Sequence, residues 1–167
     1  SDYANLLISQ RNWASKNPYA VYKKELTEEE YNNAPLVADP LCRYDCVPVV
    51  AGAYAIIISR NENERLERQV RIRAFEQSFN YENQEGDGTA TGISTFKDKL
   101  FGTAKLAPVD IGVLSIYDDY PAIVLAQLND LGIIKNEKFR DYLEGMEQQT
   151  QAVNTWGGML SAGQPGG

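Results

Sequence analysis

One strand-to-helix junction decides how this chain folds: Ser115-Ile116-Tyr117-Asp118-Asp119-Tyr120-Pro121-Ala122. The apolar run 111–116 that leads into it has the length of a β-strand, and Pro121 suits the first turn of a helix that reaches Leu131. Open α/β sheets place their sites at such junctions, where a strand ends and the N-terminus of a helix favours negative charge. An ordinary capped turn, with the tyrosines used for packing, is the alternative interpretation of the same residues.

Outward from the junction, the pattern alternates between helix and strand signals. Thr27 and Glu30 form a capping box, which starts a short helix. Residues 49–59 are apolar on both faces and predict a buried strand, whereas residues 69–75 alternate and predict a half-exposed one. We further expect helices over residues 3–16, 27–33, 94–104 (capped by Ser94 or Thr95), 121–131 and 139–143, and a loop over residues 78–92. This order indicates an α/β protein.

A charged stretch, residues 60–68, interrupts the pattern and is best interpreted as a solvated linker. We therefore divide the chain into residues 1–59, the linker 60–68, and residues 69–167. The length of 167 residues suits one compact domain. The chain ends inside a glycine-rich turn, so we expect it to be a piece of a longer protein.

Composition excludes several classes of function. The net charge is −7, which disfavours nucleic-acid binding, and no apolar run approaches the ~20 residues that a membrane span needs. There is no histidine, which excludes Ser-His-Asp and Cys-His catalysis by this chain alone. Cys42 and Cys46 cannot complete a four-ligand metal site, so we expect no metal, two reduced thiols and a cytoplasmic protein.

A second informative segment lies at the end of the chain. Residues 154–167 contain five glycines, which let the backbone approach a ligand closely and present its N–H groups. A flexible tail is the alternative, but Trp156, Met159 and Leu160 argue against it because tails are poor in large apolar side chains.

At these segments the chain resembles the thiolase superfamily, in the branch of sterol-carrier-type thiolases and acyl-CoA aldolases. Three anchors in the family's order carry the resemblance: residues 38–53, residues 116–121, and Asn154-Thr155-Trp156-Gly157-Gly158 with Gly163-Gln164-Pro165. The resemblance implies a layered α-β-α-β-α fold of two similar halves. This chain would cover the end of the first half and most of the second. The nucleophilic cysteine of the family would lie before Ser1, so Cys42 and Cys46 are not candidates for that role.

The sequence departs from the family at two positions that carry chemistry. Gln164 stands where thiolases have the histidine of Gly-His-Pro, and Tyr117 stands where they have asparagine or histidine. A carboxamide and a phenol can both donate to an enolate oxygen, and related retro-aldolases place a catalytic tyrosine in this motif. We therefore predict catalytic roles for Tyr117 and Gln164, with Asp118 orienting Tyr117 or the helix start. The residues predicted to bind substrate are Asp119, Tyr120, Gly157, Gly158 and Gly163.

The resemblance implies a thiolase-like acyltransferase that cleaves or forms a carbon–carbon bond, with thiolysis of a 3-oxoacyl-CoA as the first hypothesis. Retro-aldol cleavage of a 3-hydroxyacyl-CoA through Tyr117 is the second, and a non-catalytic subunit is the third. Coenzyme A would be substrate or product, and no cofactor would be bound by this chain. A homodimer is expected. Related enzymes also pair with a small OB-fold subunit that bears a zinc ribbon, and any zinc would belong to that partner.

Overall fold

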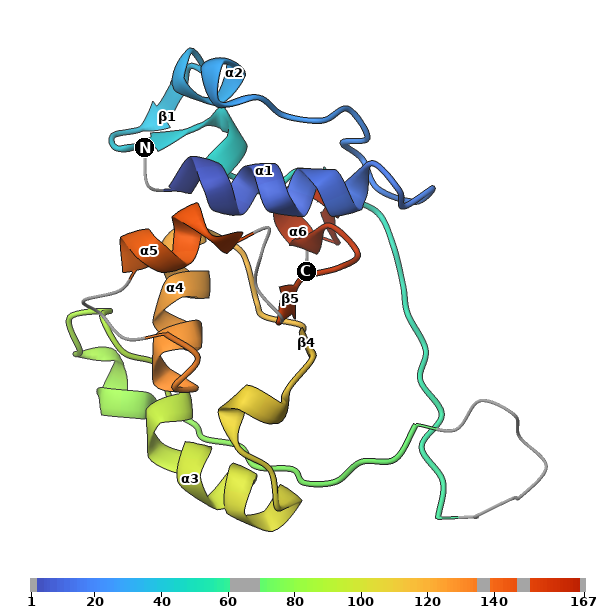
Figure 1. Cartoon of the computed structure of the whole chain (residues 1–167), viewed down its shortest axis with the longest axis vertical. Helices are drawn as coiled ribbons and strands as arrows, with labels where there is room; N and C mark the ends of the chain where they lie inside the picture. Colours follow the sequence, from blue (N-terminus) through green and yellow to red (C-terminus); the bar gives the residue numbers. More distant parts are fainter. Residues whose placement is uncertain (1–2, 61–69, 135–138, 147–150, 166–167) are drawn as a thin grey trace.

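A computed structural model of the chain describes residues 3–60, 70–134, 139–146 and 151–165 (Figure 1). The α-helices are α1 (Tyr3–Ala14), α2 (Glu28–Asn32), α3 (Ile93–Ala104), α4 (Pro121–Asp130), α5 (Phe139–Glu144) and α6 (Gly158–Ala162). The short 3-10 helices are η1 (Arg43–Asp45), η2 (Tyr81–Gln84) and η3 (Pro108–Asp110). The strands are β1 (Leu36–Ala38), β2 (Leu41–Cys42), β3 (Val49–Val50), β4 (Val113–Leu114), β5 (Ala152–Val153) and β6 (Gln164–Pro165).

Helix α1 is the central packing element. It runs across one end of α4, α5 and α6 and contacts all three helices (Figure 1). Its inward face is apolar apart from Gln10 and Arg11, which are also buried. The core that this face shares with its neighbours includes Leu6, Leu7, Val124, Leu128, Leu143 and Leu160.

Short two-stranded pairings join separate parts of the chain. Strands β1 and β2 pair antiparallel, whereas β4 pairs parallel with β5 and β3 pairs parallel with β6. The last pairing sets Val49 opposite Gln164, and the backbone N–H of Gln164 donates to the Pro48 carbonyl over 2.9 Å. The two parallel pairings position the two segments that the sequence singles out, the one after β4 and the one between β5 and β6.

Local signals in the sequence predicted most helices well. Thr27 caps α2, and the capping box with Glu30 is confirmed. Helix α4 begins at Pro121 as expected. Helix α3 begins at Ile93 after a Gly92 N-cap, so the expected caps Ser94 and Thr95 are wrong.

The strand predictions fail where a strand needs a partner. Only Val49–Val50 of the expected strand 49–59 pairs, and residues 51–59 are exposed, with Ile57 96% accessible. Residues 70–75 form no strand, and Val70 is 97% accessible. The described part of the chain sets no strand beside these two extended segments, which run outside the helices (Figure 1). Strand formation depends on inter-strand hydrogen bonds, so an apolar pattern alone does not produce it.

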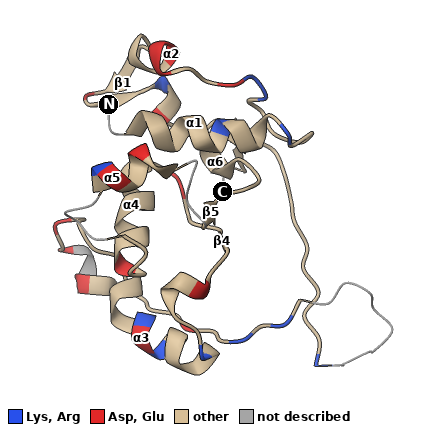
Figure 2. Ribbon diagram, in the orientation of Figure 1, with Lys and Arg blue, Asp and Glu red and all other residues tan. Residues whose placement is uncertain are grey.

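The charged linker 60–68 lies outside the described residues except for Arg60, and the domain boundaries stay a prediction. Acidic residues lie on α2, α3 and α5, with Lys and Arg scattered among them (Figure 2). None of the described helices has the length and apolar character needed to cross a bilayer.

Candidate functional site

The segment after β4 alternates between buried and exposed residues. Ile116 and Asp118 are buried, and Tyr117 between them is 48% accessible. This alternation is what extended backbone produces, because successive side chains point to opposite sides. The carbonyl of Tyr117 accepts a hydrogen bond from Gln127 Nε2 of α4 at 2.7 Å. Tyr117 therefore faces outward from a backbone that is anchored to the helix that follows it.

Asn154 links this segment to the end of β5. Its backbone N–H donates to the Leu114 carbonyl, and its side-chain Oδ1 accepts from the Ile116 N–H, both at 2.8 Å. The residue has a positive φ of 50°, and its side chain is fully buried. Sequence reasoning placed Asn154 in a motif without giving it a role of its own. The structure shows that it fixes the backbone directly before Tyr117.

Asp118 makes the corresponding link directly after Tyr117. Its carboxylate accepts from the backbone N–H groups of Met159 at 2.8 Å and Leu160 at 3.2 Å, in the first turn of α6. Burial raises the pKa of Asp118 to about 6, although these hydrogen bonds and one from Gln10 oppose the shift. Tyr117 thus lies between two buried hydrogen-bonded links to the segment that carries Gln164.

The glycines of this segment allow elements of the chain to approach one another. A Cβ on Gly158, which has φ +64°, would lie 2.0 Å from Asp118 Oδ2, and one on Gly157 would lie 2.6 Å from Ala14 Cβ. A Cβ on Gly163 would lie 2.7 Å from Val50 Cγ1. Close internal packing therefore accounts for all three glycines, and their contact with substrate stays a prediction.

The structure brings Tyr117 and Gln164 together although they are far apart in the sequence. The Gln164 carboxamide and the Asp119 carboxylate both lie close enough to the Tyr117 hydroxyl to change its pKa. Burial raises the pKa of Tyr117, the charge of Asp119 raises it further, and the Gln164 carboxamide opposes both. A phenol of raised pKa keeps its proton at neutral pH, which suits it to donate rather than to act as a base.

The remaining predicted residues lie at the edge of this group. Tyr120 is 39% accessible and precedes the first turn of α4, and Asp119 is half-buried. Gln10 of α1 was not predicted as a site residue, yet it donates to Asp118 from across the core. Its only signal in the sequence is a glutamine on an otherwise apolar helical face.

The described residues contain no group of three or more His, Cys, Asp or Glu that could hold a metal ion. Burial raises the pKa of the Cys42 thiol, which disfavours the nucleophilic thiolate. A cavity of about 720 Å³ lies along α4 and α5, lined by Leu125, Phe139 and Leu143 among others, and neither Tyr117 nor Gln164 borders it. We place the candidate site at Tyr117 and Gln164 because polar groups converge there. The volume of the cavity along α4 and α5 does not by itself indicate a site.

Comparison with known proteins identifies relatives of the whole chain. It is 28% identical to the benzoylsuccinyl-CoA thiolase subunit BbsB of Thauera aromatica, over 98% of this chain and 45% of that protein. It is 30% identical to an acetyl-CoA acetyltransferase of Methanothermobacter thermautotrophicus, over 91% of this chain and 42% of that protein. A steroid side-chain-cleaving aldolase of Thermomonospora curvata is 26% identical, over 95% of this chain and 44% of that protein. The chain spans less than half the length of these relatives.

A solved structure, the Ltp2-ChsH2(DUF35) aldolase, matches with a TM-score of 0.76 and 21% identity, covering 97% of this chain and 46% of that one. This likeness confirms the expected thiolase-like α/β fold. The family model described as "Thiolase C-terminal domain-like" matches residues 77–167, more than half of the chain. The chain therefore belongs to the thiolase superfamily.

Proposed function

We propose that this chain supplies part of the active site of an enzyme that breaks or forms a carbon–carbon bond beside the thioester carbonyl of a coenzyme A ester. The observation that carries the proposal is the approach of the Gln164 carboxamide to the Tyr117 hydroxyl on a half-exposed surface, between the buried links that Asn154 and Asp118 make. Relatives named as a thiolase subunit, an acetyl-CoA acetyltransferase and an aldolase support the same class of chemistry.

The chemical need is the same for cleavage of a 3-oxoacyl or a 3-hydroxyacyl thioester. When the C2–C3 bond breaks, its electron pair stays on C2 and spreads onto the thioester oxygen as an enolate. Positioned donors stabilise such a charge by roughly 3–4 kcal/mol each. The Tyr117 hydroxyl and the Gln164 amide N–H are the donors that we assign to this oxygen.

Thiolysis of a 3-oxoacyl-CoA is the first specific form of the proposal. A cysteine thiolate would add to C3, the C2–C3 bond would break, and the enolate would take a proton to give the shorter CoA ester. The acyl group on sulfur would then pass to the thiolate of free coenzyme A. Cys42 is buried and its pKa is raised, which disfavours it as the nucleophile, and we propose that the nucleophile comes from outside the described residues, as the family resemblance implies.

Retro-aldol cleavage of a 3-hydroxyacyl-CoA is the second form, and the Asp119 carboxylate near the Tyr117 hydroxyl favours it. A base would take the proton of the 3-hydroxyl group, the C2–C3 bond would break to leave a carbonyl product, and the enolate would take a proton. In this form the Tyr117 phenol, beside the Asp119 carboxylate, would relay that proton, and the Gln164 amide would remain the donor to the enolate oxygen. Free coenzyme A accelerates cleavage only in the thiolase form. A cysteine-bound acyl intermediate likewise excludes the aldolase form.

The test is turnover of the complete enzyme that contains this chain, with Tyr117→Phe and Gln164→Ala. Loss of one donor to the enolate oxygen predicts a fall in kcat of roughly 10²–10³-fold, with little change in KM. Tyr19→Phe is the matched control, because Tyr19 is 90% accessible and lies outside the site. Unchanged turnover in both site variants would reject the proposal in favour of a non-catalytic subunit.

We propose further that coenzyme A is substrate or product, that the chain carries no cofactor, and that it forms a homodimer which binds an OB-fold zinc-ribbon subunit. The solved neighbour, whose name joins two proteins in one aldolase, supports a partner subunit. Light scattering of the purified complex tests the stoichiometry. Zinc analysis with and without the partner tests where any metal resides.

A further inference from the structure

Gln10 is a carboxamide on the buried face of α1, which is apolar apart from Gln10 and Arg11. Its accessibility is 0%, as is that of Leu6, Leu7 and Ala14 on the same face. Its Nε2 donates to Asp118 Oδ2 at 3.1 Å, across 108 residues of sequence. Its Oε1 is buried and has no hydrogen-bond partner in the described part of the chain. Burying an amide with one end unpaired carries a cost, so packing alone does not explain a glutamine here.

The carboxylate that Gln10 contacts connects both halves of the candidate site. Asp118 follows Tyr117 directly in the chain, and it accepts the first N–H groups of α6 from Met159 and Leu160. Helix α6 ends at Ala162, two residues before Gln164. A shift of this carboxylate therefore changes the position of Tyr117 relative to α6, and with it the distance from Tyr117 to Gln164.

The donors to this carboxylate are dipoles rather than cations. Its side-chain hydrogen bonds come from the Gln10 amide and from the backbone N–H groups of Met159 and Leu160. Arg11 is the neighbour of Gln10 in α1, but its Nε donates to Ser161 Oγ and its Nη1 to the Lys24 carbonyl. Of the three donors to Asp118, the Gln10 amide alone comes from outside α6, so it fixes the carboxylate against α1.

We propose that Gln10 is a positioning residue for the thioester site: its amide orients the Asp118 carboxylate and thereby sets the position of the Tyr117 hydroxyl relative to the Gln164 carboxamide. The catalytic part of this inference rests on the function proposed above, whereas the geometric part does not. Gln10 itself has no access to substrate because it is fully buried.

The first test is Gln10→Met, which keeps the length of the side chain and removes its donor. We expect kcat of the complete enzyme to fall roughly tenfold with KM unchanged, because a small displacement of catalytic groups slows the chemical step. The matched control is Gln151→Met. Gln151 also donates one side-chain hydrogen bond, to the Pro108 carbonyl at 2.6 Å, and does not contact Asp118.

A second readout does not depend on activity. The nearby Gln164 carboxamide lowers the pKa of Tyr117, so a greater distance between the two side chains should raise that pKa further in Gln10→Met. NMR titration of ¹³C-labelled tyrosine, assigned by Tyr117→Phe, measures it directly. A raised Tyr117 pKa with unchanged turnover would support the geometric part of the inference and overturn the catalytic part. An unchanged Tyr117 pKa would overturn the positioning role itself.

A charge exchange guards against the objection that Gln10→Met only unfolds the protein. Gln10→Glu alone sets two carboxylates against each other, and we expect it to be worse than Gln10→Met. Combining it with Asp118→Asn removes the repulsion between the two carboxylates but also the acceptor for the Leu160 N–H, so turnover should exceed that of Gln10→Glu without reaching the wild-type value. If the double variant is no better than Gln10→Glu, the two side chains do not act as a pair and the inference is wrong.

Discussion

Replacing Gly158 with alanine tests the closest approach in the candidate site. The new Cβ would lie 2.0 Å from Asp118 Oδ2 and 2.9 Å from Gln10 Nε2, where neither neighbour has room to move because both are fully buried. The positive φ of 64° adds a backbone cost of roughly 1–2 kcal/mol for a residue with a side chain. Displacing the carboxylate also weakens the bonds from Met159 and Leu160, each worth roughly 1.5–3 kcal/mol because the acceptor is charged.

Together these effects predict that Gly158→Ala lowers the free energy of unfolding by at least about 4 kcal/mol. Urea unfolding followed by circular dichroism measures it. Two other glycines separate the causes, because a Cβ added to either would meet nothing within 4 Å. Gly88→Ala, at φ +76°, should show the backbone cost alone, and Gly102→Ala, inside α3, should stabilise by roughly 0.5–1 kcal/mol. If Gly158→Ala loses no more than Gly88→Ala, the close contact with Asp118 is wrong.

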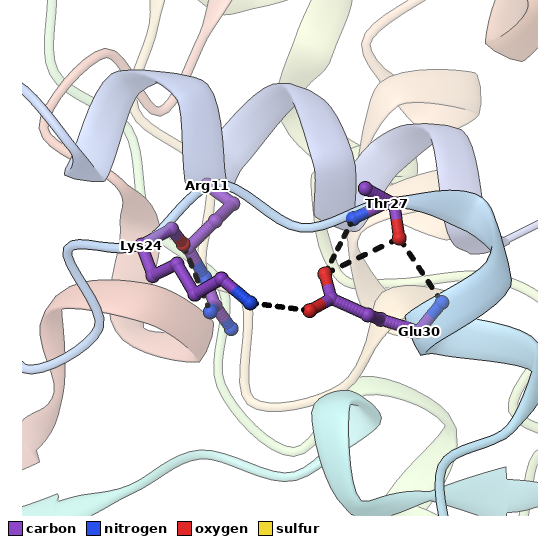
Figure 3. Close-up of polar contacts among 4 residues, drawn as sticks. All are labelled: Arg11, Lys24, Thr27 and Glu30. Atoms are coloured by element: carbon purple, nitrogen blue, oxygen red, sulfur yellow. Dashed lines mark hydrogen bonds and ion pairs between the residues drawn. The ribbon is translucent and has the colours of Figure 1, made fainter.

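Three further predictions concern other parts of the molecule. The pKa of Asp118, raised by burial to about 6 from 3.8, implies a stabilising contribution that is complete below pH 3.8 and lost as pH rises through 6. The free energy of unfolding of the wild type, relative to that of Asp118→Asn, should therefore fall by up to about 3 kcal/mol between pH 4 and 7. A difference that does not change with pH would contradict this. Thr27→Ala should cost about 1 kcal/mol in thermal or urea unfolding, because Thr27 Oγ1 accepts from the Glu30 N–H at 3.1 Å (Figure 3), and no loss would exclude a capping role. Ile57→Lys in the 167-residue chain should reduce aggregation seen by light scattering without changing stability, because Ile57 is 96% accessible in an unpaired apolar segment; a loss of stability would show that this side chain is covered.

The capping group at α2 illustrates how far local sequence signals reach. Thr27 and Glu30 are three residues apart, and both hydrogen bonds of the expected capping box form (Figure 3). Lys24 adds an ion pair to Glu30, and this contact is the largest cause that lowers the pKa of Glu30 to about 2. The start of α4 at Pro121 was equally predictable, since proline at the first helical position needs no information from elsewhere in the chain.

Strands were less predictable because their partners lie far away in sequence. The apolar pattern of residues 51–59 and 70–75 predicted strands that the structure does not form, because the pattern does not say which strand would pair with them. In contrast, Val49–Val50 does pair, and its partner is the segment around Gln164, more than a hundred residues away. Nothing in residues 49–50 alone could have named that partner.

The candidate site shows the same division between local and distant information. The residues at the junction identified Tyr117 and Asp118 as a polar cluster, and the family resemblance added Gln164. The sequence predicted that Gly157 and Gly158 let the backbone approach a ligand. In the structure, the absence of a Cβ at these two glycines instead lets α6 pack against Ala14 and Asp118. The partner of Gln10 was unpredictable because a sequence shows a polar residue on an apolar face without showing what it meets.

The arrangement around Asp118 has a consequence for how the site responds to its surroundings. A buried carboxylate that is paired with a cation keeps its charge, whereas Asp118 accepts from an amide and backbone dipoles and its pKa rises to about 6. Protonation would weaken the bonds to Met159 and Leu160, because an ionised acceptor binds N–H groups about twice as strongly as a neutral one. The link between Tyr117 and α6 is therefore strongest above pH 6, where the fold itself gains least from this group. The ionised Asp118 carboxylate thus costs the fold stability, but it holds the segments of Tyr117 and Gln164 together.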